Sequence, residues 1–137
     1  MTTNRWKTRV YWGVTLLFSG LMLLSAAMYL TGAAQIRETL AHLGYPPYLI
    51  TILGVAKLLG VPALLQSRMP ALREWAYAGF TIDLIGATAS HLFSGDPVAV
   101  ALVPASFLLP LAVSYVSRPG WRPANDAATA TLVERYT

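Results

Sequence analysis

The strongest constraint on the fold is a series of four long apolar segments that together make up most of the chain. A helix of roughly 20 apolar residues spans the hydrocarbon core of a bilayer. Only 12% of the residues are charged, whereas a soluble domain carries about 25%. We therefore predict an all-α, polytopic membrane protein with four transmembrane helices, at about residues 10–30, 48–65, 75–93 and 98–116.

The segments that connect these spans are short. A signal peptide is the alternative interpretation of the first span, but its apolar run exceeds the roughly 7–15 residues of a signal-peptide core. A short interfacial helix is expected at 34–43, ended by Gly44 and the prolines that follow. A tight turn at 94–97 separates the last two spans. We expect residues 1–117 to form the membrane domain and residues 118–137 to form a polar cytoplasmic tail.

The basic residues lie mainly on one side of the predicted spans. They occur in the N-terminal segment, in the loop between the second and third spans and in the tail: Arg5, Lys7, Arg9, Arg68, Arg73, Arg118, Arg122 and Arg135. The opposite side carries Arg37 alone, and Lys57 lies within a span. By the positive-inside rule, both termini are expected in the cytoplasm. Short loops then predict an up-down-up-down antiparallel bundle in the cytoplasmic membrane.

Lys57 lies near the middle of the second span, where a charge costs about 2.5–3.5 kcal/mol even on the mildest insertion scale. Its side chain is too short to reach either membrane surface, so the ammonium group needs a partner. Asp83 is the only carboxylate inside a predicted span, and it falls at the same depth on the next helix. We predict a Lys57–Asp83 ion pair. Such a pair can belong to a functional site. The alternative is a purely structural role, in which the pair only specifies the register of the two helices.

Small and polar residues are predicted around this pair, where they would line a cleft that opens toward the outer face. The candidate catalytic residues are Lys57, Asp83 and His91, and the candidate ligand-binding residues are Ser19, Gly54, Gly86, Ser90 and Ser106. Pro110 has no N–H group and frees the carbonyl of Ser106 as a second acceptor for the lysine. Gly54 and Gly86 have the alternative role of packing glycines. The alternative for His91, near the end of a span, is an interface residue.

Composition excludes several classes of site. The chain has no cysteine, which excludes disulfides, thiolate metal sites and thiol redox catalysis within it. His42 and His91 are the only histidines and cannot hold a metal ion without carboxylate ligands, so no metal site is predicted. His42, in a loop, receives no role. The basic residues are scattered singly, which argues against a nucleic-acid partner. No haem, flavin or iron–sulfur motif is evident, so the residues indicate no cofactor.

Three segments resemble the DoxX-like family of small four-helix membrane proteins: GVAKLLG at 54–60, REWAYAGF at 73–80 and SHLFSGDP at 90–97. The resemblance covers roughly Tyr11 to Ser117 and leaves out the tail. It implies a four-helix fold in the cytoplasmic membrane and family positions for Lys57, Glu74, Asp83 and His91. The family is named after a small membrane subunit of a thiosulfate:quinone oxidoreductase. The resemblance does not transfer an activity, and family members that act through thiols are a poor guide to a chain without cysteine.

Two functions fit these features. In the first, which we favour, a small lipophilic molecule such as a quinone binds between the helices in a redox-related role. Lys57 would stabilise an oxygen anion of that molecule, and Asp83 or His91 would relay protons from the outer face. In the second, the chain is a non-catalytic accessory or assembly subunit of a larger membrane complex. Proton-coupled transport is disfavoured because the chain shows no internal repeat. The sequence leaves open whether the protein is an enzyme and whether it forms homo-oligomers.

Overall fold

The computed structural model describes residues 3–121 and 132–134, and within these residues the regular structure is entirely helical. The main helices are α1 (Thr3–Leu30), α2 (Ala34–His42), α3 (Tyr48–Leu65), α4 (Pro70–Phe93), α5 (Val98–Ser106) and α6 (Leu108–Ser117). The expectation of an all-α chain is therefore confirmed for the described residues. Most of the predicted tail, residues 118–137, lies outside them.

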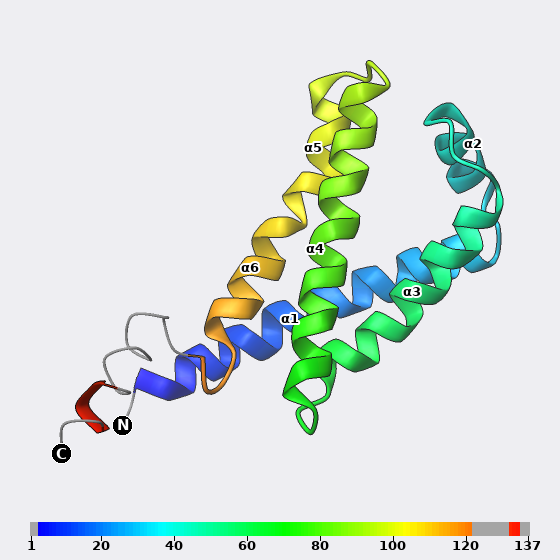
Figure 1. The fold of residues 1–137 in the computed structure, drawn as a ribbon. Coiled ribbons are helices and arrows are strands. Elements are labelled where there is room, and N and C mark those ends of the chain that lie inside the picture. Colours follow the sequence, from blue (N-terminus) through cyan, green and yellow to red (C-terminus); the bar gives the residue numbers. More distant parts are fainter. Residues whose placement is uncertain (1–2, 122–131, 135–137) are drawn as a thin grey trace.

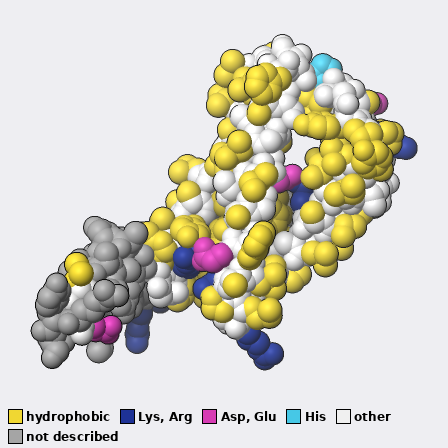
Figure 2. All heavy atoms as spheres, viewed as in Figure 1, with side chains coloured by type: hydrophobic (Ala, Val, Ile, Leu, Met, Phe, Trp, Pro, Cys, Tyr) yellow, Lys and Arg dark blue, Asp and Glu magenta, His cyan; other side chains and the backbone are white. Residues whose placement is uncertain are grey.

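Three helical segments are long and apolar enough to cross a membrane, namely Arg5–Leu30, Tyr48–Leu65 and Val98–Ser117. α4 has 24 residues, but polar side chains such as Asp83 lower its mean hydropathy. Large apolar side chains cover much of the outer surface (Figure 2), and among them Phe93 is 92% exposed. Lipid tails are as apolar as these side chains. The surface therefore fits a bilayer, and the chain is a membrane protein.

Helix ends differ from the sequence prediction at two places. α4 begins at Pro70 rather than at Trp75, because proline is favourable in the first turn of a helix. The predicted fourth span is broken at Phe107 into α5 and α6. Pro104 lies within α5 and Pro110 within α6, and prolines interrupt the hydrogen-bond ladder around the break. The short helix predicted at 34–43 is present as α2.

One apolar core holds the helices together on the side of the molecule away from α2, where α3 ends and α4 begins (Figure 1). There α1 packs on α3 and α6, and α4 packs on α3. The rings of Phe18 and Phe80 meet edge to face with their centroids 5.3 Å apart. The buried residues of this core are Phe18, Met22, Val61, Leu64, Ala76, Tyr77, Phe80, Leu84 and Leu111.

Away from the core, the helices separate into two arms (Figure 1). The first arm, residues 21–57, contains the second half of α1, α2 and the first half of α3. The second arm, residues 82–107, contains the second half of α4 together with α5. In the first arm, an added Cβ at Gly54 would lie 2.9 Å from side-chain atoms of Leu30, and in the second arm α5 packs on α4. The helices within each arm therefore contact one another, while the two arms separate from each other.

Two glycine turns shape the open end of the arms. α2 ends before Gly44 (φ +81°), and α4 ends before Gly95 (φ +77°). After each glycine, the next amide bonds back to its own helix, that of Tyr45 at 2.9 Å and that of Asp96 at 3.1 Å. Both are Schellman caps, which need the left-handed conformation that glycine adopts without strain. The side chains of Tyr45 and Asp96 are thereby held at this end, which we call the α2 end.

Candidate functional site

Three helices meet at the amino group of Lys57. This side chain comes from the middle of α3 and is buried. Its Nζ lies 2.5 Å from Oδ2 of Asp83 on α4 and 5.1 Å from the centre of the Tyr29 ring on α1. A carboxylate and the face of an aromatic ring both stabilise a cation, and together they offset the loss of water around it. The structure places side by side the two charged residues that we paired from their depth alone.

A cavity of about 570 Å³ lies between the two arms, and we call it the central cavity. Its volume falls within the roughly 300–1,000 Å³ of small-molecule sites. Leucine, methionine and other apolar side chains form most of its wall. Lys57 and Asp83 line it next to the apolar core, and Ser90 and His91 line it toward the α2 end. Figure 2 shows the hollow between the arms, with one basic and one acidic side chain at its edge.

A second cavity, of about 310 Å³, lies between α3 and α4. Gly60, Gly79 and Trp75 line it, and the Phe80 ring packs against Gly60. Lys57 and Asp83 line this cavity as well. The residues of the ion pair therefore line two largely apolar cavities.

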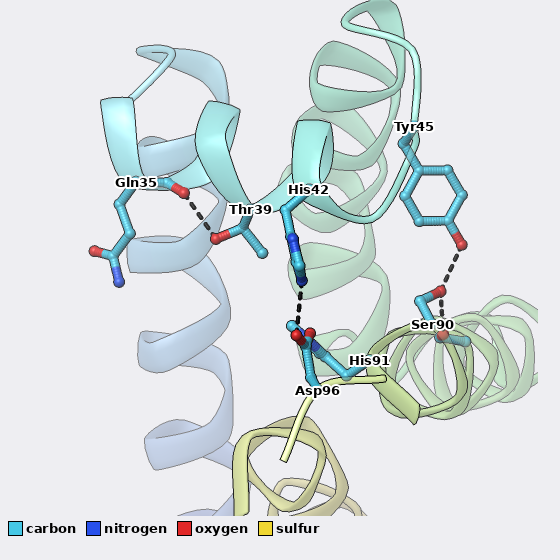
Figure 3. A network of polar contacts seen from close by, with 8 residues as sticks. Gln35, Thr39, His42, Tyr45, Ser90, His91 and Asp96 are labelled. Atoms are coloured by element: carbon cyan, nitrogen blue, oxygen red, sulfur yellow. Dashed lines mark hydrogen bonds and ion pairs between the residues drawn. The ribbon is translucent and has the colours of Figure 1, made fainter. Parts of the chain in front are cut away.

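At the α2 end, hydrogen bonds cross from one arm to the other (Figure 3). The hydroxyl groups of Tyr45 and Ser90 are 2.5 Å apart. Nε2 of His42 lies 2.7 Å from Oδ1 of Asp96, and Nδ1 of His91 lies 2.7 Å from Oδ2 of the same carboxylate. We call the group of His42, Asp96 and His91 the Asp96 bridge. It joins α2 in the first arm to α4 and its C-terminal turn in the second.

The Asp96 carboxyl group is the acceptor in this bridge. Hydrogen bonds from His91 and then from His42 hold its pKa below the usual value, because they stabilise the charged form. The side chains of Asp96 and His91 are 15% and 14% exposed, whereas that of His42 is 55% exposed. The carboxylate therefore stays charged near neutral pH, and each imidazole nitrogen that faces it donates a hydrogen.

A different set of polar contacts lies at the opposite end, next to the core. The guanidinium of Arg118 lies 3.8 Å from the centre of the Tyr115 ring and 2.6 Å from Oε1 of Glu74. The Tyr115 hydroxyl donates to Oε2 of Glu74 at 3.1 Å. Glu74 lies in α4 and Arg118 directly follows α6, so these contacts join the two helices. Glu74 therefore acts here as a structural residue, away from the central cavity.

Five of the predicted site residues line the central cavity: Lys57, Asp83, Gly86, Ser90 and His91. An added Cβ at Gly86 would meet no atom within 4 Å. This glycine therefore borders open space, and a larger side chain there would reduce the cavity.

The other three predicted residues lie outside the cavity lining. Ser19 is 2% exposed, and its hydroxyl has no hydrogen-bond partner among the described residues. Gly54 lies at the contact between α1 and α3. Ser106 is exposed, and its hydroxyl donates to the carbonyl of Val103. Ser106, predicted to bind a ligand, is thus not part of the cavity wall; the helix is broken at Phe107, whose side chain lines the cavity instead.

Residues that the sequence argument did not select also take part. Tyr29 contacts the lysine, and Tyr45, His42 and Asp96 make contacts between the arms. Depth in the membrane does not predict the contact between Tyr29 and Lys57, because this contact depends on how α1 is rotated toward α3. The glycine turns could have indicated Tyr45 and Asp96, because the residue after Gly44 or Gly95 is held close to the end of its helix.

Within the described part of the chain, no group of three His, Asp or Glu side chains is arranged to hold a metal ion. In the Asp96 bridge the nitrogen and oxygen atoms bond to one another directly. The polar groups at the central cavity are an ammonium group, a carboxylate, an imidazole and several hydroxyl groups in largely apolar surroundings.

No curated protein and no solved structure matches the chain. The sequence model of the DoxX-like family matches residues 13–114. This range contains Lys57, Asp83, the central cavity and the Asp96 bridge. It confirms the resemblance noted in the three segments around these residues, and the chain belongs to the DoxX-like family.

Proposed function

We propose that this DoxX-like protein binds a small lipophilic molecule in the central cavity, with the polar end of that molecule at Lys57 and Asp83. The observation that carries the proposal is an apolar cavity of about 570 Å³ with a buried ion pair on its wall. Ionisable groups inside a membrane are costly and usually mark a ligand or ion site. An apolar wall with few polar groups is typical of small-molecule sites.

The proposal includes four membrane spans, with α4 as the third and α5–α6 together as the fourth. α4 lies between α3 and α5 and has a length of about 36 Å at 1.5 Å per residue, enough to cross a bilayer. In this arrangement both termini lie in the cytoplasm, on the side that carries most of the basic residues. The α2 end then faces the outer side of the cytoplasmic membrane.

The ligand that fits this wall has an apolar body and a carbonyl or hydroxyl group. Two hydrogens of the Lys57 ammonium remain after one is donated to Asp83, and a carbonyl oxygen accepts such a hydrogen. A quinone has this chemistry, and we propose this class for a redox-related role. The electrons would have to come from a redox partner outside this chain, and Lys57 would stabilise the negative charge that develops on the quinone oxygen.

The proposal is tested by native mass spectrometry of protein extracted in mild detergent. Wild type is expected to retain a small lipophilic molecule, and Lys57→Met and Asp83→Asn are expected to lose it. Gly86→Leu keeps the ion pair and fills cavity space, so it is expected to lose the molecule as well. A titration with ubiquinone-1 then tests the quinone class directly.

Two matched controls accompany these variants. Lys7→Met removes the other lysine of the chain, which is exposed on α1, and Gly20→Leu enlarges an exposed glycine with open space around it. Both are expected to behave as wild type. Retention that is equal in wild type and in Gly86→Leu would contradict the proposal. Copurification of a protein partner by Lys57→Met, with no small molecule in wild type, would instead favour an accessory subunit.

A further inference from the structure

We propose that the two arms form a clamp around the central cavity, and that the Asp96 bridge holds the clamp closed at the α2 end. This inference rests on the proposed function, because it concerns how the bound molecule is admitted and retained. It assigns a role to His42, Tyr45 and Asp96, which take no part in the contacts around Lys57.

The first step of the argument is the distribution of apolar contacts. The buried core lies at one end of the molecule, and α5 packs on α4 and α6 of its own side. α2 has a single buried residue, Leu40, and its packing partner is α3. The open parts of the two arms are thus each attached to the core, with the cavity between them. A hinge movement at the core would change the separation of the arms without unpacking either one.

The second step is the chemistry of the contacts at the α2 end. The hydrogen bonds that cross between the arms are polar, and one partner of each is exposed: the His42 side chain is 55% exposed and Tyr45 is 40% exposed. When such a bond breaks, water replaces the lost partner, so the net cost of opening is small. The two carboxylates are similarly covered, 15% exposed for Asp96 and 20% for Asp83, so the difference lies in their partners: the Lys57 side chain is only 9% exposed and would lose its counter-charge away from water. The outer contacts are therefore the ones suited to break and form again during binding.

The third step concerns protons. A neutral imidazole donates one hydrogen to Asp96, and a protonated imidazole forms a stronger, charge-assisted hydrogen bond. Arg37 and Glu38 are the other charged groups of α2, and α5 contributes no titratable side chain. On α4 the group that faces Asp96 is His91. Mild acidification of the outer side should therefore keep the clamp closed, and only protonation of Asp96 itself should release it.

The clamp is tested by distance measurements between spin labels. Because the chain has no cysteine, Ala41→Cys on α2 and Ala99→Cys on α5 add two unique labelling sites, and both positions are exposed. In wild type a narrow distribution of label distances is expected. Asp96→Asn and His42→Ala are expected to broaden it and shift it to longer distances. The same two variants are expected to release ubiquinone-1 several-fold faster.

Thr39→Ala is the control for a change on the same helix, because the Thr39 hydroxyl bonds to the carbonyl of Gln35 within α2 (Figure 3). It is expected to leave the distances unchanged. A shift in Asp96→Asn with no molecule retained by any variant would support the clamp and contradict the proposed function. Unchanged distances in both Asp96→Asn and His42→Ala, with a molecule retained, would overturn the clamp and leave the proposed function standing.

Discussion

The two ends of this molecule are held together in different ways. At the core end, aromatic and aliphatic side chains from α1, α3, α4 and α6 interdigitate. A buried hydroxyl network adds to them, with Ser114 lying 2.6 Å from Thr15 and 2.7 Å from Tyr77. At the α2 end the arms are joined across a cavity by polar groups near the surface.

This difference assigns the stability of the fold to one end of the molecule and the movement needed for ligand binding to the other. Close packing resists opening, because every displaced side chain loses many contacts at once. Contacts that water can replace cost little to break. The core end is therefore expected to hold the fold, and the α2 end is expected to move. The four predictions that follow test this contrast, from the largest expected effect to the smallest.

Removal of a core ring should have the largest effect. Phe80→Ala deletes a ring that packs on Phe18 and against Gly60, and truncating a buried aromatic side chain costs about 3–5 kcal/mol. We expect a loss of about 4 kcal/mol in the free energy of unfolding, measured by denaturant titration in detergent micelles. Phe93→Ala, at a 92% exposed position of the same helix, should change it little. Equal losses in the two variants would show that the core end is not the stable half.

Breaking the central ion pair should have the next largest effect. Asp83→Asn leaves the Lys57 ammonium without its counter-charge, and separating a buried pair costs about 3–5 kcal/mol. Because the Asp83 side chain is 20% exposed to the cavity, we expect the lower end, about 3 kcal/mol. The double variant Lys57→Met/Asp83→Asn should regain part of this loss. A double variant as unstable as the sum of the two single ones would mean that the residues do not interact.

Two serine variants compare the ends of the molecule directly. Ser114→Ala leaves the hydroxyl groups of Thr15 and Tyr77 without their common partner in a buried place, and we expect a loss of about 1–2 kcal/mol. Ser90→Ala removes the partner of the Tyr45 hydroxyl near the surface, and it should leave global unfolding unchanged. The stability losses of the two variants are compared by thermal unfolding in the same detergent. A greater loss in Ser90→Ala would reverse the contrast.

The smallest effect on global stability should come from the titration of Asp96. Its pKa in the folded protein is lowered by the hydrogen bonds from His91 and His42. A depressed carboxyl pKa contributes stability that is fully present above the unfolded value, about 4, and is lost as the pH falls through the folded pKa. The label distance between the arms should therefore stay constant from about pH 8 to pH 5 and increase below about pH 4. In Asp96→Asn the distance should be long throughout. A wild-type distance that grows between pH 8 and pH 5 would contradict this assignment.

Several features could be predicted from the sequence because they depend on local chemistry or on depth alone. Apolar length places the helices, and the glycines at the ends of α2 and α4 stop them. An unpaired charge in lipid is so costly that Lys57 required a carboxylate at its own level, and Asp83 was the single candidate. The start of α4 and the break at Phe107 escaped the prediction, since proline begins a helix in one context and interrupts it in another.

What the sequence determined by itself is a membrane protein of the DoxX-like family, with Lys57 and Asp83 at one depth. Tertiary structure alone decided which groups face the space between the arms. It turned Ser106 outward, brought Tyr29 to the lysine and joined His42 to Asp96, 54 positions later in the chain. The physical reason is that depth follows from counting residues along a helix. The direction in which a side chain points depends on how each helix rotates and tilts against its neighbours, and packing at the core sets those angles.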